Sequence, residues 1–344
     1  MRIGINGFGR IGRTVFRILN RQQDIDVVAI NDLANDDVLA YLLKYDTVMG
    51  PLKDSVSVKN GVLTTSNHSI KMLNEHDPSA LPWTELGVDV VVEATGVFRT
   101  REQLQSHLDA GAGHVILTVP AKDEIDFTVV IGVNEDRLTS EHKIISNASC
   151  TTNCLAPMAK VLNDAFGIEY GVINTVHAYT NDQRLADVPH SDWRRSRAAA
   201  ENVIPTTTGA ARAVGIVLPE LKGKLDGIAM RVPVSDGSIV DLNVELNTDV
   251  NADDIRQAVK EASATDRLNS ILQYEDAPIV SSDIIGNPHS SIFDAPFTIV
   301  LDKRFVKTLN WYDNEWGYSN RVVDLIKIFI QSQNHTTRLS RPVE

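Results

Sequence analysis

The chain has 344 residues, enough for two domains of ordinary size. Apolar residues make up 43% and charged residues 23%, which is typical of a folded protein and excludes wholesale disorder. The formal net charge of −12 argues against a broad surface for nucleic acid or for an anionic membrane. We therefore expect neither a membrane partner nor a specific nucleic-acid partner.

The cysteine content and the apolar runs exclude further classes. Two cysteines, Cys150 and Cys154, are too few for a disulfide framework. A metal site is not expected either, because the pair has no further His or Cys partner nearby in the sequence. No apolar run is long enough to span a membrane. The first residues enter a strand pattern without the layout of a secretory signal. These features predict a cytoplasmic protein without a metal.

Short apolar runs alternate with helical patterns over residues 1–149. The predicted strands are residues 2–6, 27–32, 88–93, 114–117 and 127–130, and helices begin near Gly9, Asn35, Arg101 and Ser149. Apolar runs of this length between helices are typical of buried parallel strands. We therefore predict a doubly wound, Rossmann-type α/β domain.

The pattern changes in residues 150–314. The predicted strands are longer here and include residues 168–178, 226–236, 239–247, 297–302 and 305–312, with helices at 210–218 and 252–264. Several strands alternate apolar and polar residues, which predicts an α+β domain with a largely antiparallel sheet. A closing helix is expected at 315–331, followed by a polar tail at 332–344. The long Arg-rich stretch 179–209 has little periodicity, which favours a functional loop.

A glycine motif follows the first strand. Gly7, Gly9 and Gly12 have the spacing that allows a tight turn, a close approach to a pyrophosphate and helix–strand packing. Asp32 follows the second strand, where an acid can bind the adenosine ribose and would repel the 2′-phosphate of NADP. The motif predicts NAD binding. The alternative is a glycine-rich turn in a flavodoxin-like sheet, with Asp32 as a helix cap.

A thiol marks the junction of the two domains. Cys150 begins a helical pattern, and a helix N-terminus favours thiolate. His177 ends a predicted strand and can serve as a base for that thiol, and an ion pair between the two would keep the thiol reactive at neutral pH. Buried, inert residues are the alternative for both. Cys154 is interpreted as a small buried apolar residue.

Two groups of residues suggest anion binding. Arg195 belongs to an Arg-rich cluster, and Thr208 and Gly209 precede a predicted helix, whose free N–H groups suit phosphate. Arg231 lies in an apolar strand, where a charge needs a partner or a ligand. The alternatives are a salt bridge at a subunit interface, an ordinary helix cap and a buried ion pair.

Taken together, these motifs resemble the phosphorylating glyceraldehyde-3-phosphate dehydrogenase family. The similarity extends from residue 2 to about residue 330 and is carried by Asn6-Gly7-Phe8-Gly9-Arg10-Ile11-Gly12-Arg13, Ser149-Cys150-Thr151-Thr152-Asn153-Cys154, His177-Ala178-Tyr179-Thr180, Thr207-Thr208-Gly209-Ala210-Ala211, Met230-Arg231-Val232-Pro233 and Trp311-Tyr312-Asp313-Asn314-Glu315-Trp316-Gly317-Tyr318.

The resemblance implies a role for each site residue. Cys150 is the expected nucleophile and His177 its base. Thr180 and Arg231 would bind the substrate phosphate, whereas the inorganic phosphate would contact Ser149, Thr151, Arg195, Thr208 and Gly209. NAD would contact the glycine motif together with Arg10, Ile11, Asp32, Thr118 and Asn314. The resemblance also implies a homotetramer in which residues 179–202 pack against a neighbour's cofactor, and a final helix that docks on the first domain.

The implied reaction is the NAD-dependent oxidative phosphorylation of glyceraldehyde 3-phosphate to 1,3-bisphosphoglycerate through a thiohemiacetal and a thioester on Cys150. Two departures are small: His76 stands where the family often has Arg, and Val188 precedes Pro189 where Leu is common. Leu33 and Pro189 fit a preference for NAD. Erythrose-4-phosphate dehydrogenase is one alternative activity, and a non-catalytic role in binding RNA or protein is another.

Overall fold

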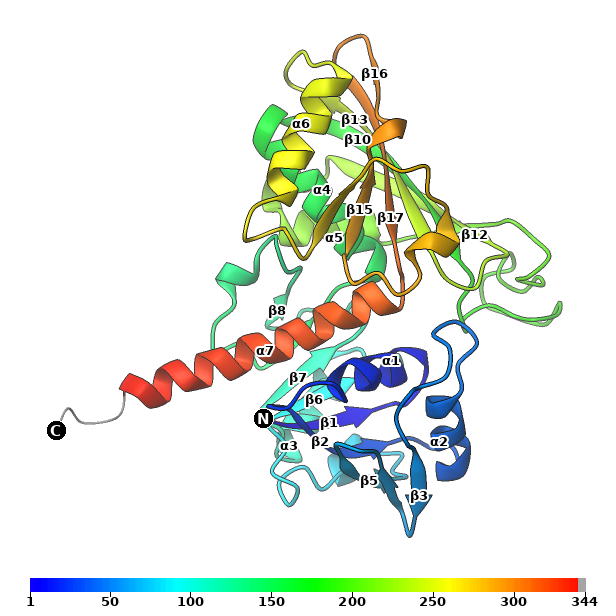
Figure 1. The fold of residues 1–344 in the computed structure, drawn as a ribbon, viewed down its shortest axis with the longest axis vertical. Coiled ribbons are helices and arrows are strands. Elements are labelled where there is room, and N and C mark those ends of the chain that lie inside the picture. The colour runs from blue at the N-terminus through cyan, green and yellow to red at the C-terminus, as the bar shows by residue number, and fades with distance from the viewer. Residues whose placement is uncertain (340–344) are drawn as a thin grey trace. The chain divides into compact units, whose positions relative to one another are not determined.

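The computed structural model describes the backbone of residues 1–339 and the side chains of residues 1–330. The described residues fall into two compact units. The first contains Met1–Val129, Asp136–Ala148 and the residues from Ser319 onward, and the second contains Val130–Glu135 and Ser149–Tyr318. In Figure 1 most of the first unit is coloured blue to cyan, and most of the second runs from green to orange.

A nine-stranded sheet forms the centre of the first unit, in the order β3-β4-β5-β2-β1-β6-β7-β9-β8. The strands are β1 (Arg2–Asn6), β2 (Asp26–Asn31), β3 (Ser57–Lys59), β4 (Val62–Thr64), β5 (Ser69–Leu73), β6 (Val90–Glu93), β7 (His114–Leu117), β8 (Phe127–Thr128) and β9 (Ile144–Ser146). All pairs from β5 to β8 along this order are parallel. The helices of this unit are α1 (Arg10–Leu19), α2 (Asp36–Lys44), α3 (Arg101–Asp109) and most of α7.

The parallel strands form because they are apolar on both faces. Val90, Val91 and Val92 of β6 are each completely buried, as expected for a strand that helices cover on both sides. The doubly wound fold is thereby confirmed. The strands β3, β4, β5 and β9 were not predicted, and β3, β4 and β9 have only three residues each.

The sheet of the second unit has the order β11-β12-β10-β13-β17-β15-β14, with β16 paired to β17. The strands are β10 (Ile168–Ala178), β11 (Ile204–Thr207), β12 (Leu225–Val232), β13 (Ser238–Leu246), β14 (Leu272–Glu275), β15 (Ser291–Asp294), β16 (Ile299–Leu301) and β17 (Phe305–Tyr312). The pairs β10–β12 and β14–β15 are parallel and the others are antiparallel. The expected largely antiparallel sheet is confirmed.

One face of this sheet is covered by helix α4 (Cys150–Phe166), which packs on β10, β13, β15 and β17. Helices α5 (Ala210–Val217) and α6 (Ala252–Ser263) pack against α4 in turn, as Figure 1 shows. Burial alternates residue by residue along β13, so that one face lies in the core. The N-terminus of α4 is held by this packing, and Cys150 is its first residue.

Helix α7 (Trp316–Leu339) is longer than predicted. The polar residues 332–339 were expected to be part of a loose tail, but they continue the helix. They contain neither Gly nor Pro, and Pro342 is the first residue that would stop a helix. Residues 340–344 of the expected tail lie outside the described residues. In the first unit, Phe329 of α7 packs on His114, with ring centroids 4.4 Å apart.

Candidate active site

The structure shows a steric requirement for glycine at two of the three motif positions, Gly7 and Gly12. Gly7 has φ +91°, and a Cβ there would lie 2.6 Å from the backbone nitrogen of Thr95. A Cβ on Gly12 would lie 2.1 Å from the Gly7 carbonyl oxygen, so this residue allows α1 to pack on β1. A Cβ on Gly9 would meet nothing within 4 Å. The first turn of α1 also carries no side-chain cap and no acidic residue, so its N–H groups suit a pyrophosphate.

Asp32 ties the end of β2 to the glycine loop. Its carboxylate accepts hydrogen bonds from the backbone N–H groups of Phe8 at 2.7 Å and Ala34 at 3.0 Å. The alternative interpretation of Asp32 as the cap of α2 is wrong, because Asn35 caps that helix. Each Asp32 oxygen keeps a lone pair for a ribose hydroxyl. These residues fit NAD.

The other predicted cofactor residues of this unit lie on neighbouring elements. Arg10, the first residue of α1, donates a hydrogen bond to Asp46 at 2.5 Å, and Ile11 beside it is half-buried. Thr118 follows β7 and is buried, with its hydroxyl donating to the carbonyl of Glu93 at 3.0 Å. His76 is exposed, and its side chain makes no hydrogen bond or ion pair with the residues that the structure describes.

The predicted nucleophile and base meet in the second unit. Ser149 is the N-cap of α4, and its hydroxyl accepts the N–H of Thr152 at 3.0 Å. Cys150 is therefore at the positive end of a 17-residue helix. Its Sγ lies 3.5 Å from Nε2 of His177, which is the penultimate residue of β10. This distance allows a proton to pass between the two atoms.

Strand pairing brings Arg231 to the same place. His177 and Arg231 are directly paired in the parallel ladder of β10 and β12. Nη1 of Arg231 lies 2.6 Å from Nδ1 of His177 and donates to the Ala178 carbonyl at 2.9 Å. Among the described residues, no carboxylate lies within ion-pair distance of Arg231. The alternative interpretation as a buried ion pair is therefore wrong, and the guanidinium remains able to bind an anion.

Burial and nearby charges act on both reacting groups. Burial raises the pKa of Cys150, while the charge of Arg231 and the N–H of Thr151 lower it. Burial, followed by the charge of Arg231, lowers the pKa of His177 to about 3. Each group alone therefore favours its neutral form. A thiolate and an imidazolium formed together attract each other across 3.5 Å, which offsets the cost of burying charge. The predicted ion pair depends on this attraction.

The predicted anion-site residues lie on several elements of the second unit. Arg195 donates to the hydroxyl of Thr206 at 2.9 Å and pairs with Asp182, and its charge also lowers the pKa of His177. The hydroxyl of Thr208 accepts the N–H of Ala210 at 3.1 Å, but the N-cap of α5 is Gly209, which is exposed, so Thr208 is not the N-cap residue.

Thr180 and Thr151 are placed differently from each other. Thr180 is half-buried just beyond β10, and its backbone N–H donates to Gln183 at 3.4 Å. The side chain of Thr151 points into the core, where its hydroxyl lies 2.8 Å from that of Tyr312. The ring of Tyr312 in turn contacts His177 edge-on, at a centroid distance of 5.9 Å. Tyr312 was not predicted, because its place depends on the pairing of distant strands.

Asn314 is buried just after β17. Its Oδ1 accepts a hydrogen bond from the hydroxyl of Ser238 at 2.7 Å, and that hydroxyl accepts the N–H of Ala178 at 3.1 Å. The amide nitrogen of Asn314 is thus oriented as the donor toward a ligand. Ser238 was also missed, since a serine at the start of a strand carries no sequence signal of its own.

Cys154 behaves as predicted. It is completely buried one turn after Cys150, with Sγ 3.5 Å from the carbonyl oxygen of Asn310. Burial raises the pKa of its thiol, so it is a poor nucleophile. Both cysteines are free. Among the residues whose side chains the structure describes, 1–330, no cluster of His, Cys, Asp and Glu could hold a metal ion. No described helix is long and apolar enough to cross a bilayer.

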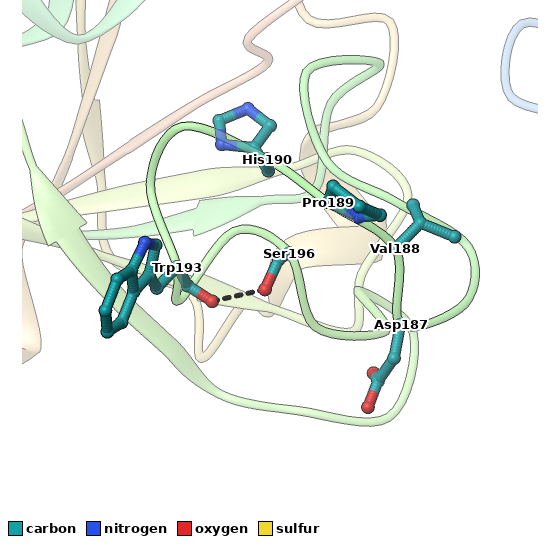
Figure 2. Close-up of a pocket in the computed structure, with 6 residues that line it drawn as sticks. All are labelled: Asp187, Val188, Pro189, His190, Trp193 and Ser196. Atoms are coloured by element: carbon teal, nitrogen blue, oxygen red, sulfur yellow. Dashed lines mark hydrogen bonds between the residues drawn. The ribbon is translucent and has the colours of Figure 1, made fainter.

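The described pocket lies apart from Cys150, in the loop between β10 and β11 (Figure 2). Its volume is about 390 Å³, and its lining residues are Asp187, Val188, Pro189, His190, Trp193 and Ser196. Figure 2 shows the hydroxyl of Ser196 bonded to the carbonyl of Trp193. The side chain of Trp193 is 86% exposed, which is unusual for a large apolar residue on a surface without a partner.

Comparison with known proteins agrees with this geometry. Residues 1–101 match the model for the NAD binding domain of glyceraldehyde 3-phosphate dehydrogenase, and residues 149–314 match the model for its C-terminal domain. The chain is 56% identical to a glyceraldehyde-3-phosphate dehydrogenase of Streptomyces coelicolor, over 97% of this chain and 99% of the relative.

Two further relatives carry the same name. The enzyme of Borreliella burgdorferi is 56% identical over 96% of this chain and 100% of its own length. The enzyme of Mycobacterium tuberculosis is 55% identical over 95% of this chain and 98% of its own length. With both family models matched and relatives of this identity aligned over nearly the whole chain, the chain belongs to the glyceraldehyde-3-phosphate dehydrogenase family.

Proposed function

We propose that the chain oxidises glyceraldehyde 3-phosphate with NAD and inorganic phosphate and releases 1,3-bisphosphoglycerate. The observation that carries the proposal is the group formed by Cys150, His177 and Arg231. It places a thiol 3.5 Å from a base and a half-buried cation without a carboxylate partner beside that base. An aldehyde with a phosphate group matches these three residues, because the thiol attacks the aldehyde and the cation binds the phosphate.

The first half of the reaction joins the substrate to the enzyme. His177 Nε2 takes the proton of the Cys150 thiol, and Sγ attacks the aldehyde carbon to form a thiohemiacetal. The backbone N–H of Cys150, at the start of α4, and His177 stabilise the oxyanion. His177 returns its proton to the oxyanion, which forms the thiohemiacetal hydroxyl, and the neutral imidazole then accepts that proton again as the carbon loses a hydride and a thioester is left. The chemistry that bound NAD supplies is the acceptance of this hydride.

The second half releases the product. An oxygen of inorganic phosphate attacks the thioester carbon, the carbon–sulfur bond breaks and Cys150 leaves as a thiolate. The acyl phosphate retains the energy of the oxidation. Hydrolysis of the thioester would have lost that energy. Inorganic phosphate must therefore be bound in preference to water at this step. Arg195, Thr208 and Gly209 supply a cation and a helix N-terminus for that purpose, together with Ser149 and the backbone N–H of Thr151 at the start of α4, since the Thr151 hydroxyl is engaged with Tyr312.

The cofactor residues divide into those for the dinucleotide and those for its ring. The N–H groups after Gly9 contact the pyrophosphate, and Asp32 accepts the adenosine ribose hydroxyls. Arg10, Ile11 and Thr118 complete the set in the first unit. In the second unit, Asn314 donates its amide N–H to the nicotinamide carboxamide, and Thr180 joins Arg231 at the substrate phosphate. Residues 1–149 are thus the NAD-binding domain, residues 150–314 form the catalytic domain, and residues 315–331 dock on the first domain.

The proposal includes a homotetramer in the cytoplasm. Large apolar side chains are exposed on both units. Leu185 and Trp193 in the loop after β10 are 87% and 86% exposed, and Tyr41 of α2 and its C-cap residue Tyr45 are 61% and 51% exposed. Surfaces of this kind usually contact a partner, and identical copies of the chain are the partner that the family resemblance implies. The free cysteines agree with a reducing compartment.

The experiment is the rate of NADH formation by the purified protein with glyceraldehyde 3-phosphate or erythrose 4-phosphate, each with and without inorganic phosphate. Rapid, phosphate-dependent oxidation of the three-carbon substrate is expected. A preference for the four-carbon substrate without phosphate dependence would contradict the proposal. A lack of turnover with either aldehyde would favour a binding role. Neither alternative is favoured by the relatives or by the intact Cys150–His177 pair.

A further inference from the structure

Two buried carboxyl groups lie side by side where β13 begins and β17 ends. Ser238 and Tyr312 are the last pair of this antiparallel ladder. Asp236 lies in the turn before β13, and Asp313 directly follows β17. The two residues are 0% and 1% exposed, and burial and the charge of Asp313 raise the pKa of Asp236. Two adjacent buried carboxylates repel each other strongly, which favours one proton shared between the two groups.

The hydrogen-bond donors show which residue holds the proton. The carboxylate of Asp313 accepts the backbone N–H of Gly286 at 2.7 Å and two N–H groups at the start of α7 at 2.6 and 2.9 Å. Three donors stabilise its charged form. Oδ1 of Asp236 accepts only the N–H of Gly237 at 2.8 Å, and its buried Oδ2 has no donor among the described residues. Asp236 is therefore the acid that donates to Asp313.

The charges around Asp236 agree with this assignment. Burial, followed by the neighbouring charge of Asp313, raises the pKa of Asp236 to about 9, and Glu315 adds a smaller effect of the same sign. The short helix η4 (Ser281–Ile284) packs on Gly237, where a Cβ would lie 2.4 Å from the carbonyl oxygen of Ser281. Its acid, Asp283, is engaged with the N–H of Val280 at 2.7 Å. Among the described residues, no cation acts on Asp236, so a second negative charge there would be poorly compensated.

The same turn also holds Asn314. Ser238, two residues after Asp236, donates to Oδ1 of Asn314 at 2.7 Å. The two residues that flank Gly237 thus bind the two consecutive residues Asp313 and Asn314. Gly237 makes this possible, because its φ of +86° and its close approach to η4 exclude a side chain. The position of the Asn314 amide therefore depends on both hydrogen bonds.

We propose that Asp236 is a positioning residue whose proton holds Asp313, and with it the amide of Asn314, in the orientation that binds the nicotinamide carboxamide. The inference rests on the role given to Asn314 under the proposed function. When Asp236 loses its proton, two adjacent buried charges repel each other and the turn separates from Asp313. The Asn314 amide then loses its fixed orientation, and binding of the nicotinamide ring weakens.

The test compares NADH with ADP-ribose, which has the same adenosine and pyrophosphate groups but no nicotinamide. Dissociation constants are measured between about pH 7 and pH 10 on Cys150→Ser protein, so that the thiol does not titrate. The affinity for NADH should fall about five- to tenfold over this range, which is the loss expected for about one hydrogen bond. The ratio of NADH to ADP-ribose affinity should fall by the same factor, because ADP-ribose has no nicotinamide for Asn314 to bind and titrations in the dinucleotide site affect both ligands equally.

Three variants in the same background separate the proton from the packing. Asp236→Asn keeps an N–H donor toward Asp313 and cannot ionise, so its ratio of NADH to ADP-ribose affinity should be independent of pH. Asp236→Ala has no donor, and this ratio should be low at every pH. The matched control is Asp294→Asn, since Asp294 is an equally buried acid that contacts Trp311 at 2.9 Å and does not face Asn314. It should retain the alkaline loss.

Two results would overturn the proposal: an affinity ratio that does not change with pH in protein with Asp236 intact, or an alkaline loss that persists in Asp236→Asn. Infrared spectroscopy tests the proton without NAD. A carboxylic acid C=O band should be present at pH 7 and absent in Asp236→Asn, and a missing band also overturns the proposal. If Asn314→Ala binds NADH normally, the role proposed for Asn314 is wrong. The effect of Asp236 on NADH binding, which depends on that role, is then wrong as well. A normal acid band would then show that the error lies in that role.

Discussion

His177 and Arg231 are paired across the parallel strands β10 and β12, with Nδ1 and Nη1 2.6 Å apart. The base of the reaction and the cation proposed for the substrate phosphate are therefore fixed by one ladder of backbone hydrogen bonds. Gly227 lies four residues before Arg231 and allows β12 to approach β10, because a Cβ there would lie 2.1 Å from the Ile173 carbonyl oxygen. The distance between base and phosphate is thus set by the sheet.

Arg231→Ala should weaken the use of a phosphorylated aldehyde specifically. Loss of a charge-assisted contact should lower kcat/KM for glyceraldehyde 3-phosphate by about tenfold or more. The value for unphosphorylated glyceraldehyde should change much less. Steady-state kinetics with both aldehydes gives the ratio, and equal losses on the two would show that Arg231 acts only through His177.

Cys150→Ser should abolish oxidation of the aldehyde, with a loss of about a thousandfold or more, because a serine hydroxyl is a far weaker nucleophile. NADH binding should persist. Cys154→Ser is the control within the same helix, and its turnover should stay within a few-fold of the unaltered protein. Turnover by the Cys150 variant at the original rate would disprove the assignment of the nucleophile.

His177→Asn should change both the rate and the pH dependence of thiol alkylation. Burial raises the pKa of the Cys150 thiol, so without its partner the thiol is protonated at neutral pH and becomes reactive only in alkali. With His177 present, the ion pair should give a plateau near neutral pH. Iodoacetamide rates near pH 7 should be about a hundredfold lower in the variant. Parallel profiles for both proteins would remove His177 as the activating base.

Asp32→Ala should weaken the discrimination against NADP. The carboxylate that would repel a 2′-phosphate is removed, and the ratio of kcat/KM for NAD to that for NADP should fall about tenfold. The hydrogen bonds to Phe8 and Ala34 are lost as well, so affinity for NAD also falls. An unchanged ratio would place the selectivity elsewhere.

Alanine at two of the motif glycines should affect different properties, the stability of the fold in one case and the affinity for NAD in the other. A Cβ on Gly12 meets the Gly7 carbonyl oxygen at 2.1 Å, so Gly12→Ala should destabilise the fold by about 1–3 kcal/mol. A Cβ on Gly9 meets nothing, so Gly9→Ala should fold normally but bind NAD more weakly. Thermal denaturation and NADH titration of both variants provide the comparison, and equal stability would contradict the packing argument.

The sequence predicts the first unit well because its signals are local. A strand, three glycines, a helix, a second strand and Asp32 follow one another within 32 residues. Cys150 and His177 are predicted for the same reason, since each lies at the end of a recognisable element. Asp236 and Ser238 are different, because their importance arises only when β13 pairs with β17. No pattern within the turn itself indicates that partner.

Two of the structural predictions were wrong because the segments concerned are polar. The polar run 332–339 was predicted to be loose, although a helix can extend through polar residues that lack a breaker. The strand β11 lies in a stretch expected to be structureless, and it forms because β12 provides its antiparallel partner. In both cases the apolar pattern was weak, and the structure was decided by neighbouring residues.

The pairing of β10 and β12 also constrains which changes of length the gene can tolerate. Side chains alternate between the two faces of a strand, so one codon inserted between Gly227 and Arg231 would turn the guanidinium to the opposite face. Insertions in the loop after β10 would leave that alternation intact. Among descendants of this gene, we therefore expect variation in length to accumulate in the loop, while the interval from Gly227 to Arg231 stays at its present length.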